Sequence, residues 1–153
     1  MRLKPDVDSF VCDFCQAIYI PEPNADGVRV LDESAFLACP VCRASMVHAA
    51  IAGRRILYCA ACRGMLIGMD LFVGLIQDLR ASRDTPAATL PPPDRKDLQR
   101  RINCPQCGKV MDTHPYGGPG NVIIDDCESC EVNWLDYGEL QRIVRAPERH
   151  YGE

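Results

Sequence analysis

Ten cysteines are the residues of this 153-residue chain whose types and spacing point to chemistry. They form five Cys-x-x-Cys pairs: Cys12/Cys15, Cys39/Cys42, Cys59/Cys62, Cys104/Cys107 and Cys127/Cys130. Two residues between thiols let one tight turn aim both sulfur atoms at the same point, and two such turns supply the four thiolates of a tetrahedral zinc site. A single pair is a weak signal because redox motifs share it, but five pairs together predict metal binding.

An internal repeat indicates which pairs share a metal ion. Residues 39–79 and 104–144 align: each copy opens on Cys-Pro-x-Cys, and Met46 or Met111 follows four residues past the second cysteine. The next pair comes after an interval of 16 residues in the first copy and 19 in the second. The repeat therefore predicts two sites, each with one structural zinc: Cys39, Cys42, Cys59 and Cys62 in the first, and Cys104, Cys107, Cys127 and Cys130 in the second.

The second copy resembles a known family. It contains Cys-Pro-Gln-Cys-Gly at 104–108 and Trp-Leu-Asp-Tyr-Gly-Glu-Leu at 134–140, a pattern similar to the zinc ribbons of the transcription-factor-IIB type. The first copy departs from it, with Arg43 for the glycine, Leu66 for the tryptophan, and 68–72 for the acidic segment. The resemblance implies two tandem zinc ribbons with one structural zinc each. Members are mostly small bacterial proteins of unassigned role, so it implies a fold and not promoter binding.

The elements that must position these thiols are short. β-rich runs at 55–58 and 122–124 lead into the second cysteine pair of each copy. A helix is expected after it, and in the second copy Asp136 and Glu139 have the spacing of a capping box. The predicted fold is therefore a small metal-stabilised α+β protein. It consists of two zinc ribbons, each a β-hairpin followed by a helix, plus an N-terminal Cys-x-x-Cys segment.

Composition divides the chain into five parts. We expect an N-terminal segment at 1–38, ribbon 1 at 39–80, a proline-rich linker at 81–98, ribbon 2 at 99–146, and a tail at 147–153. A linker of this kind predicts that the two ribbons are separate, so that loss of a ligand in one leaves the other loaded with zinc. Trp134, the only tryptophan, is expected to be buried against its own hairpin.

The predicted helix at 66–79 is apolar around most of its circumference, which one ribbon cannot cover. Packing against the other ribbon or against the N-terminal segment would cover it. In the second case Phe10, Phe14 and Ile18 would be buried against the helix. The alternative is that the helix is an interface with a partner protein or with a second copy.

Cys12 and Cys15 have no obvious partner pair. Three pairs precede residue 80, and three pairs cannot complete two four-thiolate sites. The repeat favours Cys39/Cys42 with Cys59/Cys62, although Cys12/Cys15 with Cys39/Cys42 would also have a ribbon-like spacing. The spare thiols are then free, oxidised to a disulfide, or paired with their equivalents in a second chain around a shared extra zinc.

Other function classes receive less support. No nucleophile elbow, phosphate-binding loop or His-Glu-x-x-His motif is present, so we expect no enzymatic activity. The formal net charge is -4, and two zinc centres of about -2 each would make it about -8, which disfavours nucleic acid. The charge is uneven, however: 34–69 contains four arginines and no acid, so Arg54 and Arg55 mark the candidate nucleic-acid contact.

Location and role follow from what remains. No apolar run of about 18 residues is present, and no signal-like segment begins the sequence, so we expect no membrane span and a cytoplasmic protein with reduced thiols. The sequence favours a non-enzymatic, zinc-binding adaptor module that contacts proteins. The alternatives are a nucleic-acid-binding, transcription-related factor using Arg54/Arg55, and a thiol redox or metal-handling protein using Cys12/Cys15.

Overall fold

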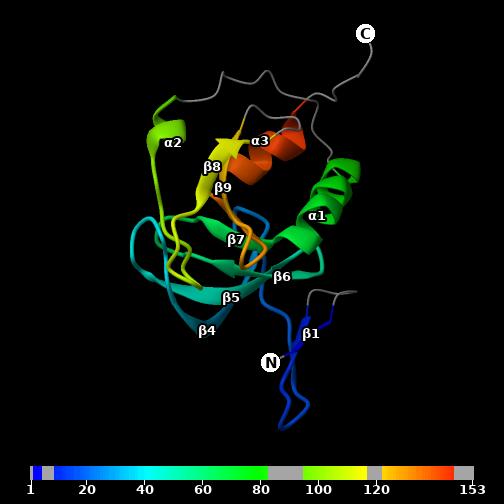
Figure 1. Ribbon diagram of the computed structural model, residues 1–153. Helices are drawn as coiled ribbons and strands as arrows, with labels where there is room; N and C mark the ends of the chain where they lie inside the picture. The colour runs from blue at the N-terminus through cyan, green and yellow to red at the C-terminus, as the bar shows by residue number, and fades with distance from the viewer. Residues whose placement is uncertain (1, 5–8, 83–94, 117–121, 147–153) are drawn as a thin grey trace.

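The computed structural model describes residues 2–4, 9–82, 95–116 and 122–146 (Figure 1). Its strands are β1 (Arg2–Lys4), β2 (Ser9–Val11), β3 (Ile18–Tyr19), β4 (Arg29–Ala38), β5 (Ser45–Ile51), β6 (Arg54–Tyr58), β7 (Met65–Gly68), β8 (Asp112–Pro115), β9 (Ile123–Cys127) and β10 (Val132–Leu135). Its helices are α1 (Met69–Ala81), α2 (Arg95–Gln99) and α3 (Glu139–Arg145). The predicted α+β fold class is confirmed.

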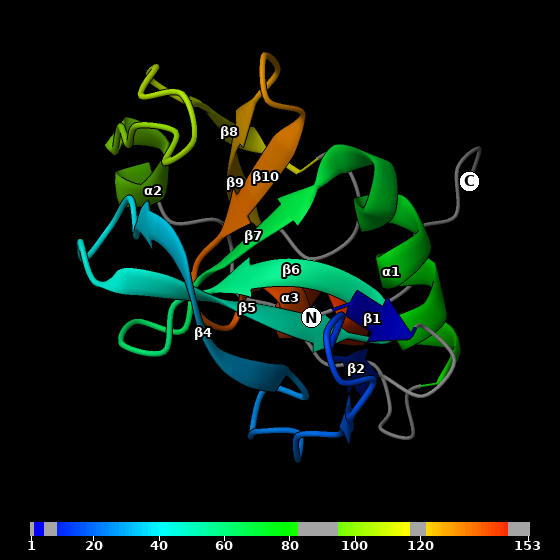
Figure 2. The ribbon, with the colours of Figure 1, turned by 90° about the horizontal axis from the view of Figure 1, so that it is seen from below.

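Both ribbons belong to one antiparallel sheet. Its strand order is β4-β5-β6-β7-β10-β9-β8, and ribbon 1 and ribbon 2 meet where β7 pairs with β10 (Figure 2). The sequence predicted two units separated by a linker. Most of that linker (83–94) and the tail (147–153) lie outside the described residues, and α2 occupies 95–99. The ribbons are nevertheless joined directly, because β7 of ribbon 1 pairs with β10 of ribbon 2 within one seven-stranded sheet.

The pairing of β7 with β10 places equivalent repeat residues opposite each other. Leu66 and Trp134 each stand four residues past the last cysteine of their copy, and they are direct cross-strand partners. The contacts on either side are reciprocal. The Met69 N–H at the start of α1 donates to the Glu131 carbonyl of ribbon 2 (2.8 Å), while Arg63 of ribbon 1 lies 4.2 Å from the ring centre of Tyr137, just before α3. The two ribbons therefore meet around a pseudo-two-fold axis, as two subunits do in an isologous dimer.

Helices α1 and α3 cover one face of this sheet (Figure 1). Phe72, Leu75 and Ile76 of α1 are buried in the same core cluster as Leu140 and Ile143 of α3. The apolar helix is thus covered by the sheet and by the other ribbon. Its predicted start was wrong, because residues 66–68 continue strand β7 in order to pair with β10, and the helix begins only at Met69.

The ends of these helices are tied together. The Arg80 guanidinium, in the last turn of α1, donates to the carbonyls of Ile143 (2.7 Å) and Ala146 (2.9 Å) at the end of α3, where the helix dipole favours a positive charge. At the start of α3 the Glu139 carboxylate accepts from the Asp136 N–H at 2.7 Å, which is one half of the predicted capping box.

The N-terminal residues do not cover α1. Phe10 is fully buried, but against Leu31 and Ala50 on the sheet. Phe14 and Ile18 are 98% and 60% exposed, so the prediction that all three pack on the 66–79 helix was wrong. Strands β2 and β3 form a hairpin that projects away from the main sheet (Figure 1).

No helix among the described residues has the length and apolarity needed to cross a membrane.

Candidate metal centres

The cysteine pairs lie in tight turns, here called knuckles. Four of the five share one pattern of backbone hydrogen bonds, whereas in the Cys127 knuckle the Glu131 N–H donates to the Glu128 carbonyl (3.3 Å). In the first knuckle of ribbon 1 the Cys39 N–H donates to the Ala44 carbonyl (2.7 Å), and the Arg43 N–H donates back to the Cys39 carbonyl (3.0 Å). The N–H groups of Val41 and Cys42 both point at the Cys39 sulfur, at 3.4 Å. Such a turn fixes both thiols and surrounds the first with amide dipoles that stabilise a thiolate.

The residue after the second cysteine is left-handed in all five knuckles. These residues are Gln16, Arg43, Arg63, Gly108 and Glu131, with φ between 55° and 78°. For an L-residue this conformation costs about 1–2 kcal/mol, and only Gly108 avoids that cost. The departure of Arg43 from the family's glycine is therefore compatible with the knuckle, and it indicates that the hydrogen bonds and the metal enforce the turn.

Ribbon 1 brings the sulfurs of Cys39, Cys42, Cys59 and Cys62 together. They lie within 4.8 Å of one another, with 3.6 Å between Cys39 and Cys62 and 3.4 Å between Cys42 and Cys59. Four thiolates at a Zn–S distance of about 2.3 Å form a tetrahedron with edges of about 3.8 Å. The observed spacing fits a zinc ion, and this pairing is the one that the repeat indicated.

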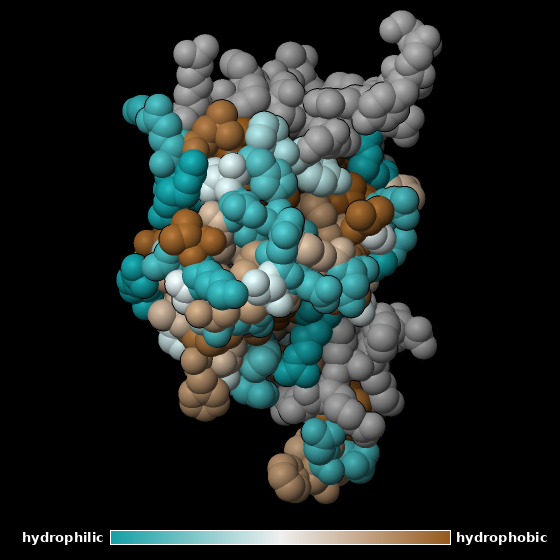
Figure 3. Space-filling model, viewed as in Figure 1, coloured by the Kyte–Doolittle hydropathy of each residue, from teal (hydrophilic) through white to brown (hydrophobic). Residues whose placement is uncertain are grey.

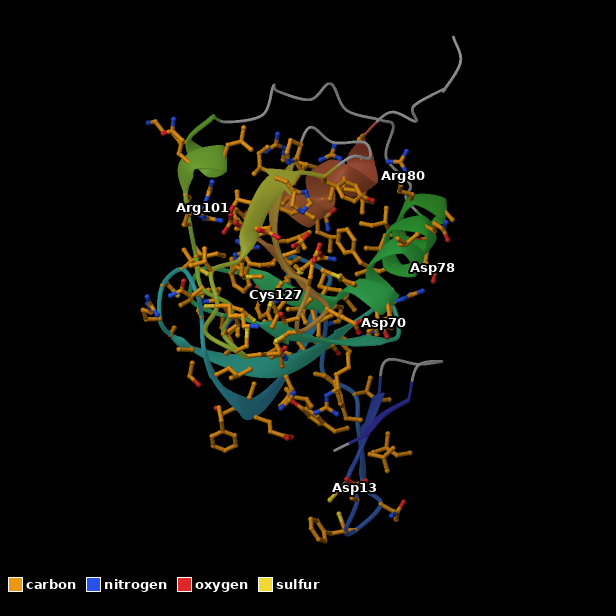
Figure 4. All side chains as sticks on the ribbon, viewed as in Figure 1. Asp13, Asp70, Asp78, Arg80, Arg101 and Cys127 are labelled. Carbon is orange, nitrogen blue, oxygen red and sulfur yellow. The ribbon has the colours of Figure 1, made fainter. Side chains whose placement is uncertain are left out.

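Ribbon 2 forms the equivalent cluster from Cys104, Cys107, Cys127 and Cys130, with 3.6 Å between the sulfurs of Cys107 and Cys127. Cys127 is labelled in Figure 4. The burial of the four residues follows the same order in both clusters: buried, exposed, buried, intermediate. Four protein thiolates close the coordination sphere, which is typical of a structural zinc and leaves no position for substrate. The chain therefore has two sites consistent with two zinc ions.

Thiol ionisation differs within each cluster. The Ala44 N–H lowers the pKa of Cys42 to about 7, and the Lys109 N–H does the same for Cys107. Burial instead raises the pKa of Cys39 and of Cys104. The exposed thiol of each cluster is thus ready to bind near neutral pH, whereas the buried thiolates need the charge of a bound cation.

Trp134 lies between the two centres and is fully buried in a cluster with Leu66 and with cysteines of both sites. Its burial was predicted, but its main neighbour was not. A Cβ added to Gly64, in ribbon 1, would lie only 2.2 Å and 2.6 Å from two carbons of the indole ring. The indole therefore occupies space that ribbon 1 leaves open by having a glycine directly after its second knuckle.

A partly buried ion pair joins the N-terminal segment to ribbon 1. The Asp26 carboxylate accepts two hydrogen bonds from Arg63 (2.9 and 2.6 Å) and one from the Tyr58 hydroxyl (2.7 Å). Burial alone would raise the pKa of Asp26, but these hydrogen bonds outweigh it and hold the pKa below its usual value. Burial and the neighbouring carboxylate raise the pKa of Tyr58 to about 12.

Ribbon 2 has its own buried network. Arg100 donates to Asp125 (3.0 Å) and Asp136 (2.6 Å), Thr113 donates to Asp125 (2.6 Å), and the Trp134 indole N–H donates to Asp136 (3.1 Å). Asp125 is 1% exposed. The sequence did contain a signal for this burial. Successive residues of a strand point to opposite faces of the sheet, so Asp125 lies on the face opposite to Ile124.

The two arginines of the candidate nucleic-acid contact and the histidines of the chain have the following surroundings. Arg54 forms a 2.7 Å ion pair with Asp78 of α1, and Arg55 lies 6.0 Å above the Phe10 ring. His114 contacts Asp126 at 2.6 Å. His48 is half-buried, and its Nδ1 has no hydrogen-bond partner among the described residues. His150 lies outside the described residues.

A pocket of about 400 Å³ opens on the sheet face opposite α1 and α3. The cross-strand register places His48, Leu57 and Leu66 in a row along that face. The pocket is lined by Ala35, Leu37, His48, Arg55, Ile56, Leu57, Leu66, Gly68, Gln106 and Val132. It is mostly apolar with a basic side, and most of its lining comes from ribbon 1.

Comparison with known families agrees with part of this description. Residues 103–146 match the family described as Transcription factor zinc-finger, the TFIIB-type zinc ribbon. The match covers ribbon 2, and the four-cysteine cluster at 39–62 indicates a second ribbon-like site that it does not include. Comparisons with curated proteins and with solved structures gave no match.

Proposed function

We propose that this chain is a non-enzymatic, cytoplasmic adaptor that binds a protein segment in the pocket on the open face of ribbon 1. The closed four-thiolate spheres support a structural rather than catalytic role for zinc. The pocket carries the proposal, because it is a concave, largely apolar surface with a few polar groups, as is usual for binding sites.

The pocket favours a particular kind of partner. Leu37, Leu57 and Leu66 offer apolar contact. Arg55 and His48 also line the pocket, and the buried Nδ1 of His48 has no hydrogen-bond partner within the described part of the chain. Ribbon 1 is also the basic part of an acidic chain. A peptide that places an aliphatic or aromatic side chain in the pocket, next to an acidic group, would satisfy these features.

Two earlier candidate surfaces are less favoured. The 66–79 helix was considered because of its excess apolar surface, but Phe72, Leu75 and Ile76 are buried within the chain. The nucleic-acid alternative needs Arg54 and Arg55, and Arg54 is held by Asp78 at 2.7 Å. Salt-dependent binding of a DNA or RNA duplex that is lost in Arg54→Ala would favour this alternative over a peptide ligand.

A peptide array tests the proposal. Zinc-loaded protein is applied to an array of short peptides with systematically varied apolar and acidic positions. We expect binding to peptides with one large apolar residue next to Asp or Glu, and at least a tenfold loss in Arg55→Glu, because the pocket wall then repels the acidic group.

The matched control is Arg101→Glu, which makes the same charge change at an exposed position of ribbon 2, away from the pocket lining. The control should bind like the unchanged protein, and both variants should retain two zinc ions. Equal loss in both variants would show that binding depends only on total charge and would contradict a role for the pocket.

A further inference from the structure

The turn at Cys12 and Cys15 is built in the same way as the knuckles that hold zinc. The Cys12 N–H donates to the Ala17 carbonyl (2.9 Å), and the Gln16 N–H donates to the Cys12 carbonyl (3.0 Å). The equivalent bonds of the Cys39 knuckle are 2.7 and 3.0 Å, and Gln16 has a φ of 61° where Arg43 has 70°. The turn at Cys12 therefore has the same hydrogen bonds and the same left-handed residue as a knuckle of a four-cysteine cluster.

The amide groups around the first thiol are arranged alike. The N–H groups of Cys15 and Phe14 face the Cys12 sulfur, as those of Cys42 and Val41 face the Cys39 sulfur at 3.4 Å. These amides lower the pKa of Cys12, whereas burial raises the pKa of Cys39. A lowered thiol pKa suits a redox cysteine and a metal ligand alike, since Cys42 and Cys107 of the metal-site knuckles also have it.

This knuckle supplies only half of a site. Among the residues that the structure describes, the clusters able to hold a metal use the other eight cysteines, and Cys12 and Cys15 are in none of them. They lie at the tip of the projecting β2–β3 hairpin, beside Asp13 (Figure 4). Cys15 is exposed and Phe14 is 98% exposed, so both thiols are accessible to another molecule.

We propose that this knuckle is half of a third zinc site, completed by the same knuckle of a second copy of the chain around a two-fold axis. Two thiolates are half of a tetrahedral set, and a second copy supplies the identical other half. Zn²⁺ displaces the protons of four thiols and forms four Zn–S bonds, without oxidation or reduction.

Two further features fit a second copy as the occupant. The hairpin exposes the large apolar side chains Phe14, Ile18, Tyr19 and Ile20, and an isologous contact would cover them. Figure 3 shows apolar atoms at the tip of this projecting hairpin, next to hydrophilic ones. The acidic residue inside the knuckle is no obstacle, because Glu128 occupies the same position as Asp13 within a metal-site knuckle of ribbon 2.

Native mass spectrometry of the full zinc-loaded chain under reducing conditions tests this inference. We expect a dimer with five zinc ions, two in each chain and one shared, that dissociates on dilution. In the double variant Cys12→Ser/Cys15→Ser we expect a monomer with two zinc ions. Its Trp134 emission should be unchanged, because the substitutions lie far from ribbon 2. Gln16→Gly is the matched control in the same turn: glycine accepts the positive φ, so five zinc ions per dimer should remain.

The other outcomes would overturn the shared site. A reduced wild-type monomer with two zinc ions and alkylatable Cys12 and Cys15 would do so, as would a disulfide between them, which would instead support the redox alternative. A dimer with four zinc ions that survives the double substitution would place the interface elsewhere. The inference rests on the structural-zinc part of the proposed function but not on the pocket, and peptide binding that depends on Arg55 can fail while this site is found, or the reverse.

Discussion

Ribbon 1 and ribbon 2 share their knuckles but differ in what fills the space between them. At the pseudo-two-fold axis ribbon 2 contributes Trp134, and ribbon 1 contributes Leu66 at the equivalent position. Two residues earlier ribbon 2 has Val132, and ribbon 1 has the smallest residue, Gly64. The large indole lies against the glycine of the other copy. Two tryptophans could not occupy this contact, so the apparent degeneracy of ribbon 1 is a packing complement to ribbon 2.

The two copies also differ in what covers the open sheet face. In ribbon 1 the segment before the first knuckle is strand β4 at the sheet edge, and the pocket lies beside it. In ribbon 2 the equivalent segment follows α2, and its Arg100 reaches Asp125 and Asp136 on that face. The metal sites of the two copies are alike, whereas the surfaces are not. The repeated part of each copy thus forms the metal clusters, and the proposed peptide binding depends on the part in which the copies differ.

The largest effect is expected from breaking one metal site. Cys127→Ser should release the zinc of ribbon 2, a loss of about 10–16 kcal/mol of binding free energy. Because β10 pairs with β7, we expect ribbon 1 to lose protection as well, contrary to the separation that the proline-rich linker suggested. Hydrogen exchange of residues 45–58 measures this, together with zinc content.

Cys59→Ser changes the equivalent cysteine of ribbon 1 and serves as the control. It should increase hydrogen exchange in ribbon 2, as Cys127→Ser does in ribbon 1. If hydrogen exchange in 45–58 is unchanged in Cys127→Ser, the ribbons are independent and the shared sheet does not couple them.

A single methyl group gives the next largest effect. Gly64→Ala places a Cβ against the Trp134 ring and should lower the free energy of unfolding by about 1–3 kcal/mol, as overpacking does. The matched change Gly74→Ala lies in α1 and meets only the flexible end of Arg54, so helix propensity should raise stability by about 0.5–1 kcal/mol. Urea unfolding of the zinc-loaded proteins compares the two.

A double variant tests whether the two ribbons are truly complementary. Gly64→Val enlarges one side of this contact and Trp134→Leu shrinks the other, and each change alone should lower the free energy of unfolding. The double variant should lose about 0.5–3 kcal/mol less than the sum of the two single losses, because the valine fills space that the indole leaves. Additive losses in urea unfolding would show that Trp134 and Gly64 do not act as a pair.

The sequence contained the metal sites but not their arrangement. The spacing and the internal repeat together selected the eight cysteines that the structure brings into two clusters. The spacing of Asp136 and Glu139 predicted a helix in this region, and α3 begins at Glu139 with Gly138 as its N-cap. The pairing of β7 with β10 could not be predicted, since it joins residues 66 and 134, and no local pattern selects one sheet edge over another. The buried Asp125 and Asp26 were missed for the same reason, because their arginine partners lie 25 and 37 residues away.

A smaller effect is expected from the ion pair between Asp26 and Arg63. Asp26→Asn removes the charge that Arg63 and Tyr58 bind, and should loosen the N-terminal segment while both zinc ions remain. The loss should be smaller than that of Gly64→Ala, because Arg63 is partly exposed. The pKa of Asp26 is lowered in the fold, so its contribution is present above about pH 4 and is lost as the pH falls further. Zinc thiolates also protonate in acid, so the comparison is made by urea unfolding at neutral pH. Arg63→Lys should give part of the loss, and equal stability in all three proteins would contradict the role of this pair.

The smallest predicted effect is the pH dependence of stability, to which His48 in ribbon 1 and His114 in ribbon 2 contribute with opposite sign. Burial and the nearby Arg55 lower the pKa of His48 in ribbon 1, so its contribution to stability is present above about pH 6.5 and is lost as the pH falls below that value. In ribbon 2 burial opposes protonation of His114, but the hydrogen bond to Asp126 outweighs it and raises the pKa. That contribution is therefore complete below about pH 6.5 and is lost as the pH rises through the higher folded-state pKa. Proton NMR of the imidazole rings between pH 6 and 8 should show the His114 midpoint above the His48 midpoint, with the signals assigned by His48→Gln and His114→Gln. The reverse order would mean that the Asp126 contact does not hold in solution, and that the difference between the two hairpins does not extend to their electrostatics.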